Sequence, residues 1–182
     1  MHFLCLKLIL KDKLLKMIRK ANLKDLERII EITRACAKHM ISQNIFQWNE
    51  HYPSKEIFEE DVKNQSLYLI EADSEVVGCL CISDVIDEVY KTVKWLTLTN
   101  KNVYLHRLAV HPDFQGQGLA LKLMDFAEKL TLKKGYKSIR LDTFSGNAKN
   151  NKFYKLQGYT KLEKIFYRKQ SDMPFHCYEK IL

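Results

Sequence analysis

The chain has 182 residues, of which 46% are apolar and 29% charged, with only 3 prolines and 6 glycines. This length suits one domain of ~100–200 residues, and the composition excludes a disordered or fibrous protein. The formal net charge of +8 favours an acidic partner, which charge alone does not identify as nucleic acid, a membrane or a small polyanion. The basic residues are scattered, as on a solvated surface, so we expect no nucleic-acid partner.

The cysteine count and the first residues bear on the compartment. Five cysteines are an odd number, without metal-ligand pairs or the density of a small secreted scaffold, so we expect a cytoplasmic protein and no bound metal. Residues 1–16 resemble a signal peptide only loosely, because Lys7 interrupts an apolar run that is also shorter than a membrane span of ~20 residues. We expect them to be an N-terminal extension ahead of one domain, residues 17–182. Membrane association of the extension stays a minor alternative.

The first half of this domain predicts a strand, two helices and a hairpin. Residues 17–20 could form a short strand, and Asn22 suits the N-cap of a helix with apolar residues at helical spacing. Ser54 follows a proline and suits the N-cap of a short acidic helix. Residues 67–72 and 76–83 are rich in β-forming residues and flank a polar turn, which indicates an antiparallel hairpin.

The second half alternates strands and helices. The expected elements are a strand at 103–110, a helix from Leu119 to near Gly135, a strand at 138–143, a short helix at 147–156, and closing strands at 161–168 and 175–181. Residues 84–102 are ambiguous, because 94–99 fit a strand or a connecting loop. The order of elements predicts a mixed α/β (α+β) domain with a twisted sheet flanked by helices.

A glycine-rich turn is the most informative local feature. The strand at 103–110 runs into residues 111–114 and then into Gln115, Gly116, Gln117 and Gly118, which open an amphipathic helix. Such a turn leaves backbone N–H groups unpaired and free of Cβ crowding, so a phosphate can lie against them. Two glycines can also simply mark a tight turn, and a dinucleotide-binding fingerprint does not fit, because its third glycine and acidic residue are missing.

A second segment lies downstream, where residues 147–159 read NAKNNKFYKLQGY. Together the two segments resemble the GNAT superfamily of N-acetyltransferases, whose loop reads Gln/Arg-x-x-Gly-x-Gly/Ala and whose later helix reads roughly Asn-x-x-Ala-x-x-Phe-Tyr-x-x-x-Gly-Phe. Three residues match every defined position of the loop: Gln115, Gly118 and Ala120. Four match the helix, Asn147, Phe153, Tyr154 and Gly158, while Asn150 and Tyr159 depart from it. The resemblance extends from about Met17 to the C-terminus.

The resemblance implies a fold and a cofactor. The fold is a mostly antiparallel sheet of six to seven strands with about four helices, in which the strand at 104–110 and the strand from Ser138 splay apart. The cofactor is acetyl-CoA or coenzyme A, with its pantetheine arm between these strands and its pyrophosphate on the glycine loop. The residues assigned to it are Leu108, Ala109, Val110, Gln115, Gly116, Gln117, Gly118, Leu119, Ala120, Asn147 and Tyr154.

The implied activity is transfer of an acetyl group from acetyl-CoA to a primary amine of a small-molecule or protein acceptor, by direct attack in a ternary complex. A primary amine of pKa ~10 is mostly protonated at neutral pH, so a base must remove a proton. In the family a backbone N–H, here of Leu108, stabilises the oxyanion, and a tyrosine matching Tyr154 assists the departing thiolate. The alternative for Tyr154 is packing of a short helix.

The base stays open, because many relatives carry a carboxylate on the splayed strand and this sequence has none there. Strict alternation would place four residues on one face of that strand: Tyr104, His106, Leu108 and Val110. His106 is then the candidate base by its ordinary pKa, with a structural role as the alternative. Glu50 or Asp142, acting through water, would serve equally well.

The acceptor pocket of the family uses the segment between its first two helices, which here is the aromatic loop at 45–52. The expected substrate-binding residues are Phe46, Trp48, Glu50 and Tyr52. Glu50 could attract a cationic amine and Trp48 could offer a π face, although the aromatics could equally only cap the core. The rival function is a GNAT-fold module that binds acyl-CoA without turnover. A homodimer is expected by resemblance alone.

Overall fold

The computed structural model describes residues 18–168 and 170–182. Its strands are β1 (Ile18–Lys20), β2 (Leu67–Ala72), β3 (Glu75–Ser83), β4 (Asn102–Val110), β5 (Ser138–Phe144), β6 (Thr160–Ile165) and β7 (Phe175–Ile181). They form a seven-stranded sheet in the order β1-β2-β3-β4-β5-β7-β6. The expected N-terminal extension lies outside the described residues.

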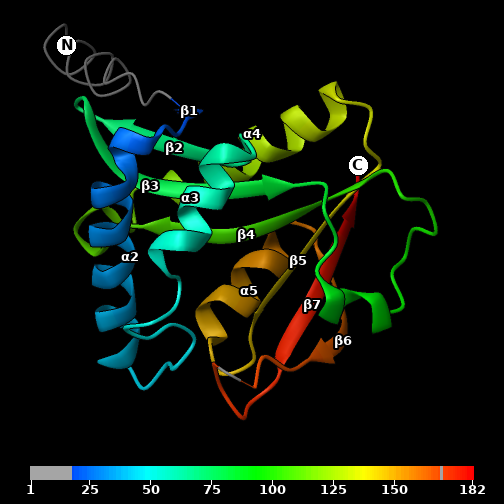
Figure 1. Cartoon of the computed structure of the whole chain (residues 1–182). Helices are drawn as coiled ribbons and strands as arrows, with labels where there is room; N and C mark the ends of the chain where they lie inside the picture. Colours follow the sequence, from blue (N-terminus) through cyan, green and yellow to red (C-terminus); the bar gives the residue numbers. More distant parts are fainter. Residues whose placement is uncertain (1–17, 169) are drawn as a thin grey trace, which may run out of the picture.

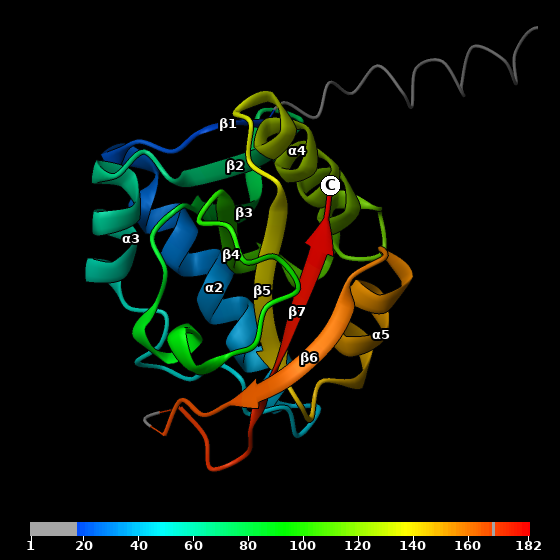
Figure 2. The same cartoon turned by 90° about the vertical axis from the view of Figure 1, so that its right-hand side faces the viewer.

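Within the described residues, four α-helices flank the sheet (Figure 2). The pair α2 (Leu26–Ile41) and α3 (Lys55–Lys63) lies on one side, and α4 (Leu119–Lys133) and α5 (Ala148–Leu156) lie on the other. All strand pairs except β4 with β5 are antiparallel. The predicted mixed, mostly antiparallel fold is therefore confirmed. Within residues 18–168 and 170–182, no helix has the length and apolar character needed to cross a membrane.

The first helical segment begins with a capping box. The Asn22 side chain accepts a hydrogen bond from the N–H of Lys24 (2.9 Å), and the Asp25 side chain accepts one from the N–H of Asn22 (2.8 Å). A short 3-10 turn follows, so α2 begins only at Leu26. The predicted N-cap is therefore confirmed. Leu23 lies in this turn and is 56% exposed.

The segment between β3 and β4, for which the sequence allowed a strand or a loop, is a loop that contains the 3-10 helix η2 (Glu88–Thr92). Beyond η2, the N–H of Leu96 and the hydroxyl of Thr97 both donate to Glu179. The Glu179 carboxylate is itself buried in an ion pair with Arg140, Oε1 to Nε 3.0 Å. Because a carboxylate satisfies this backbone, the segment does not pair with a neighbouring strand.

The two parallel strands in the middle of the sheet separate. β4 pairs with β5 only over Asn102–Leu105 and Ser138–Leu141, and beyond these residues the strands diverge (Figure 1). β5 remains paired with β7 along its whole length. One edge of β4 beyond Leu105 is therefore left without a strand partner, as the resemblance implied.

Hydrophobic clusters pack against both faces of the sheet around β4. α4 buries Leu123, Met124 and Ala127, which confirms the predicted apolar face, and packs them with α5 against the sheet. A second cluster joins α2 and α3 to the opposite face. The second half of β4 is thus supported from both sides while its edge toward β5 stays open.

Candidate active site

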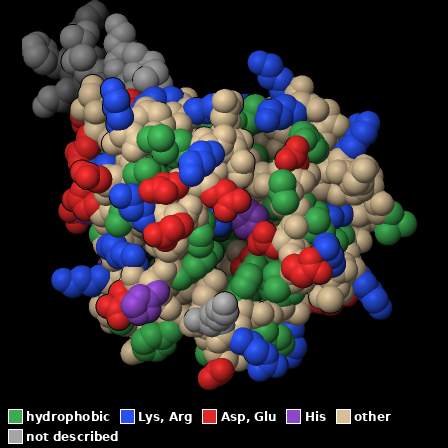
Figure 3. Space-filling view, in the orientation of Figure 1, with side chains coloured by type: hydrophobic (Ala, Val, Ile, Leu, Met, Phe, Trp, Pro, Cys, Tyr) green, Lys and Arg blue, Asp and Glu red, His purple; other side chains and the backbone are tan. Residues whose placement is uncertain are grey.

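Two cavities open where β4 and β5 diverge. The larger, of about 990 Å³, is lined by β4, α3 and the aromatic loop, and the smaller, of about 360 Å³, by the end of β4 and the start of α4. Figure 3 shows that this face of the molecule is hollowed near its centre, where acidic and hydrophobic side chains gather. Five residues line both cavities: Gln47, Trp48, Leu108, Asn150 and Tyr154. Ligands in the two cavities could therefore meet beside Leu108 and Tyr154.

The glycine loop forms one wall of the smaller cavity. Gly116 and Gly118 have left-handed backbone conformations, with φ of 76° and 74°, and a Cβ added to either would meet no atom within 4 Å. Glycine is required here by the backbone conformation and leaves open space beside the loop. Within the described chain, no backbone carbonyl accepts a hydrogen bond from the N–H groups of residues 116–121. The loop and the first turn of α4 therefore present free donors and a positive helix end, which suit a phosphate group.

The loop is tied to the end of β4. The Gln115 side chain donates from Nε2 to the Val110 carbonyl at 3.0 Å, and Cys36 donates from Sγ to the same oxygen at 3.2 Å. Leu119 and Ala120 line the smaller cavity with Gln115, whereas the exposed Gln117 does not. Gln115 thus fixes the glycine loop, and of the Val110 main chain only the N–H stays free for a ligand.

The open edge of β4 presents main-chain groups of alternate residues. The N–H of His111 donates to the Val77 carbonyl in β3 at 2.8 Å. By alternation Ala109 also turns its main chain toward β3, and Leu108 and Val110 turn theirs toward the opening. Leu108, Ala109 and Val110 all line the smaller cavity. Strand backbone without a strand partner is suited to pair with an extended ligand.

The predicted single face of Tyr104, His106, Leu108 and Val110 is wrong. A bulge shifts the pairing of β3 with β4, so that Cys79 lies opposite Ala109 but Cys81 opposite His106. Leu108 and Val110 consequently pack toward α4, whereas Tyr104 packs with the η2 loop on the other face. One extra residue in a strand reverses the side to which every later side chain points.

Asn147 lies at the start of α5 and Tyr154 lies near its end. Tyr154 is buried, which raises the pKa of its hydroxyl, and it lines both cavities. Asn147 is the N-cap of α5: its Oδ1 accepts from the N–H of Asn150 (3.0 Å), and its Nδ2 donates to Gln47 Oε1 (3.3 Å). Asn147 thereby links α5 to the aromatic loop, and Tyr154 places a protonated hydroxyl where the cavities meet.

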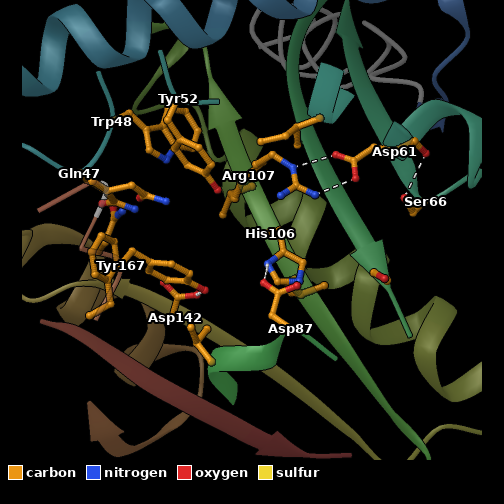
Figure 4. A pocket seen from close by; sticks show the side chains of 18 of the residues that line it. Gln47, Trp48, Tyr52, Asp61, Ser66, Asp87, His106, Arg107, Asp142 and Tyr167 are labelled. Carbon is orange, nitrogen blue, oxygen red and sulfur yellow. Dashed lines mark hydrogen bonds and ion pairs between the residues drawn. The ribbon is translucent and has the colours of Figure 1, made fainter. Parts of the chain in front are cut away.

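Carboxylates, among them Asp87 and Asp142, line the larger cavity (Figure 4). Asp142, on β5, accepts hydrogen bonds from the hydroxyls of Tyr90 and Tyr167 through its Oδ1. Burial raises the pKa of Asp142 to about 6, against the opposing effect of the two tyrosine donors. Burial also raises the pKa of Asp87, whose side chain is 48% exposed. These groups suit an amine better than an anionic acceptor.

His106 lies in the same cavity, stacked on Tyr90 with ring centroids 6.0 Å apart. Its Nδ1 is 3.9 Å from Asp87 Oδ2. Burial lowers the pKa of His106 to about 3, and the Arg107 charge acts in the same direction. His106 is therefore neutral near pH 7 but a weak proton acceptor, which makes Asp142 the better-matched base of the two.

The aromatic loop contributes only part of what was expected. Trp48 and Tyr52 line the larger cavity, and Trp48 also packs in the core beneath α2. Phe46 is 54% exposed and the Glu50 side chain 84% exposed, and neither lines a cavity. The Oδ1 atom of Asn49 accepts hydrogen bonds from the N–H groups of residues 51 and 52. These bonds form a tight turn that directs Glu50 into solvent.

Among the lining residues that the sequence did not predict are Gln47, Asp61, Asp87 and Arg107. The one signal for Arg107 was a charged residue inside the apolar strand at 103–110. Asp61 belonged to a helix that was expected to be merely acidic. Its Oδ1 and Oδ2 bind the Arg107 guanidinium at 2.7 and 2.8 Å, so the two charges compensate each other.

Comparison with known proteins agrees with this geometry. The family model described as "Acetyltransferase (GNAT) family" matches residues 26–159. The thialysine N-epsilon-acetyltransferase of Mus musculus is 36% identical over 62 residues, 34% of this chain and 36% of that protein. The match thus spans about a third of the length of that curated relative.

Solved structures align over nearly the whole chain. A GNAT-family acetyltransferase from Listeria monocytogenes has a TM-score of 0.74 at 24% identity, covering 92% of this chain and 95% of its own. The PaiA N-acetyltransferase of Thermoplasma acidophilum, solved in complex with coenzyme A, has a TM-score of 0.66 at 22% identity, covering 91% and 98%. At these identities the likeness establishes the fold. With the family match over residues 26–159, the chain belongs to the acetyltransferase (GNAT) family.

Proposed function

We propose that this protein transfers an acetyl group from acetyl-CoA to a primary amine by direct attack in a ternary complex. The observation that carries the proposal is the meeting of two chemically different cavities at Leu108 and Tyr154. The smaller offers free N–H groups and an unpaired strand edge, and the larger contains carboxylates. A phosphate-bearing acyl donor and an amine could therefore be held with their reacting ends together, which is the main requirement of a direct transfer.

The smaller cavity fits acetyl-CoA. The N–H groups of residues 116–120 would hold the pyrophosphate, and the main chain of Leu108 and Val110 would pair with the pantetheine arm. Asn147 would contact the cofactor at the start of α5, beside Tyr154. Acetyl-CoA, when bound, supplies an activated thioester carbonyl to the amine. The same fit holds for coenzyme A, the product.

The larger cavity fits a cationic amine. Asp87 and Asp142 would attract it, and Asp61 already compensates the charge of Arg107. Trp48 and Tyr52 line the same cavity and would flank the alkyl part of an amine. The proposed acceptor is therefore a primary amine that enters in its protonated form.

Proton transfers would be divided between two side chains. Asp142, ionised above pH about 6, would accept the amine proton through a water molecule, with His106 as the less suitable alternative. The N–H of Leu108 would donate to the carbonyl oxygen as negative charge develops there. Burial keeps the Tyr154 hydroxyl protonated, so it can donate to the departing sulfur.

The test is a binding measurement followed by a turnover measurement. A ligand that binds only the folded protein adds about 2.7 kcal/mol of stability at 100 times its Kd, so acetyl-CoA should raise the unfolding temperature clearly. Thialysine, lysine and benzylamine would then be assayed as acceptors by release of the CoA thiol. No shift at millimolar acetyl-CoA would refute the cofactor site. Binding without turnover of any amine would instead support a non-catalytic acyl-CoA-binding module.

A further inference from the structure

Arg107 lies in β4 with a backbone conformation that residues other than glycine rarely adopt. Its φ of 54° is in the left-handed region, at the point where two residues of β4 stand opposite one residue of β3. A residue other than glycine in this region costs on the order of 1–3 kcal/mol, so surrounding contacts must hold it there. The bulge at Arg107 is therefore a strained feature that the fold maintains.

The bulge determines where Leu108 points. Leu105 and Leu108 pack against the same hydrophobic cluster although they are three residues apart in one strand. In a regular strand such residues lie on opposite faces. Leu108 borders both cavities, and the bulge inserts Arg107 immediately before it. If the bulge relaxed, the Leu108 N–H would turn away from its present direction.

The contact that holds Arg107 is a buried, bidentate ion pair with Asp61 of α3. Asp61 Oδ2 accepts from Nε at 2.8 Å and Oδ1 from Nη2 at 2.7 Å, and both side chains are about nine-tenths buried. Asp61 is fixed in turn, since Oδ1 also accepts from the Cys81 thiol at 3.4 Å and its carbonyl accepts from the Ser66 hydroxyl at 3.0 Å. Figure 4 shows this connection from α3 across to β4.

We infer that the Asp61–Arg107 ion pair is a positioning device. It holds the left-handed backbone of Arg107 and so aims the Leu108 N–H at the thioester carbonyl oxygen. The inference rests on the proposed function, because the aimed N–H matters only if an acyl donor lies along the open edge of β4. A bidentate pair suits this task better than a single hydrogen bond, since it fixes direction as well as distance.

The test uses two double variants that differ only by one Cβ. Asp61→Asn with Arg107→Gly and Asp61→Asn with Arg107→Ala both remove the ion pair without leaving a buried charge. Glycine adopts a φ of 54° without strain, whereas alanine does not, so only the glycine variant should keep the bulge. We expect kcat of the glycine variant to exceed that of the alanine variant by about tenfold or more, because a lost oxyanion donor costs ~10²–10³. The KM for acetyl-CoA should be similar in both.

A second readout needs no acceptor amine. The carbonyl stretch of bound [1-13C]acetyl-CoA reports the hydrogen bond to its oxygen, so infrared spectra should show a shift to lower wavenumber in the wild type and the glycine variant. In the alanine variant the carbonyl band should lie closer to that of free acetyl-CoA. If the alanine variant does not fold, Asp61→Asn alone should show a smaller shift of the band toward that of free acetyl-CoA, since one acceptor oxygen remains for Arg107.

Identical carbonyl bands and equal kcat in the two double variants would overturn the positioning role while leaving the proposed function intact. Failure of the wild-type protein to bind acetyl-CoA would overturn the proposed function and the positioning role with it.

Discussion

Replacement of Asp142 by Asn should make the protein more stable and less active. Burial raises the pKa of Asp142 from 3.8 to about 6, so the folded state binds this proton more tightly than the unfolded chain does. The protonated Asp142 side chain therefore stabilises the folded state fully below pH about 4, and this contribution is lost as the pH rises through about 6. At about 1.4 kcal/mol for each tenfold change in proton affinity, the ionised carboxylate costs about 3 kcal/mol at pH 8. A neutral carboxamide avoids this cost and can still accept the hydroxyl of Tyr90.

Urea unfolding of both proteins at pH 4, 5, 6, 7 and 8 measures this cost. The variant should match the wild type at pH 4 and exceed it by about 3 kcal/mol at pH 8. Asp125→Asn, an exposed change on α4, is the control and should show no such trend. In the wild type kcat/KM should rise with pH through about 6, and the variant should lose this rise together with most of its activity. A stability difference that does not grow with pH would refute the buried-carboxylate argument.

Three further experiments test other parts of the site. Tyr154→Phe should lower kcat at least tenfold, measured by CoA thiol release, while calorimetric titration shows unchanged acetyl-CoA affinity; an unchanged kcat would remove Tyr154 from the chemistry. Gly118→Ala and Gly135→Ala both place a Cβ at a φ near 75° and should each cost about 1–2 kcal/mol in urea unfolding. Only Gly118→Ala should also weaken acetyl-CoA binding, since Gly135 does not line the cavity. Asp87→Asn should raise the KM for a cationic amine several-fold, whereas Glu50→Gln, at a solvent-exposed residue, should leave it unchanged. A raised KM in Glu50→Gln alone would instead place the acceptor site on the loop surface.

Much of the fold could be predicted because local patterns determined it. Asn22 marked a helix start that the capping box confirms, and the run from residue 103 to 110 marked the strand that carries the site. The loop at 94–99 could not be assigned, because its backbone is satisfied by Glu179, a partner more than 80 residues away. Local periodicity contains no information about such a contact.

The site was predictable where it depends on main-chain geometry and less so where it depends on side-chain direction. The glycine loop needs left-handed residues, and Gly116 and Gly118 show this directly in the sequence. The faces of His106 and Leu108 were predicted by strict alternation, which the bulge at Arg107 breaks. Nothing near Arg107 in the sequence predicts a left-handed arginine, since its partner Asp61 lies on a different element.

The most direct measurement is to incubate the protein with [13C2]acetyl-CoA and a set of primary amines, and to follow the label by mass spectrometry. We predict an N-acetylated amine carrying the label, formed in a one-to-one ratio with free CoA. Recovery of the label only as acetate, or as intact acetyl-CoA bound to the protein, would contradict transfer between the two cavities.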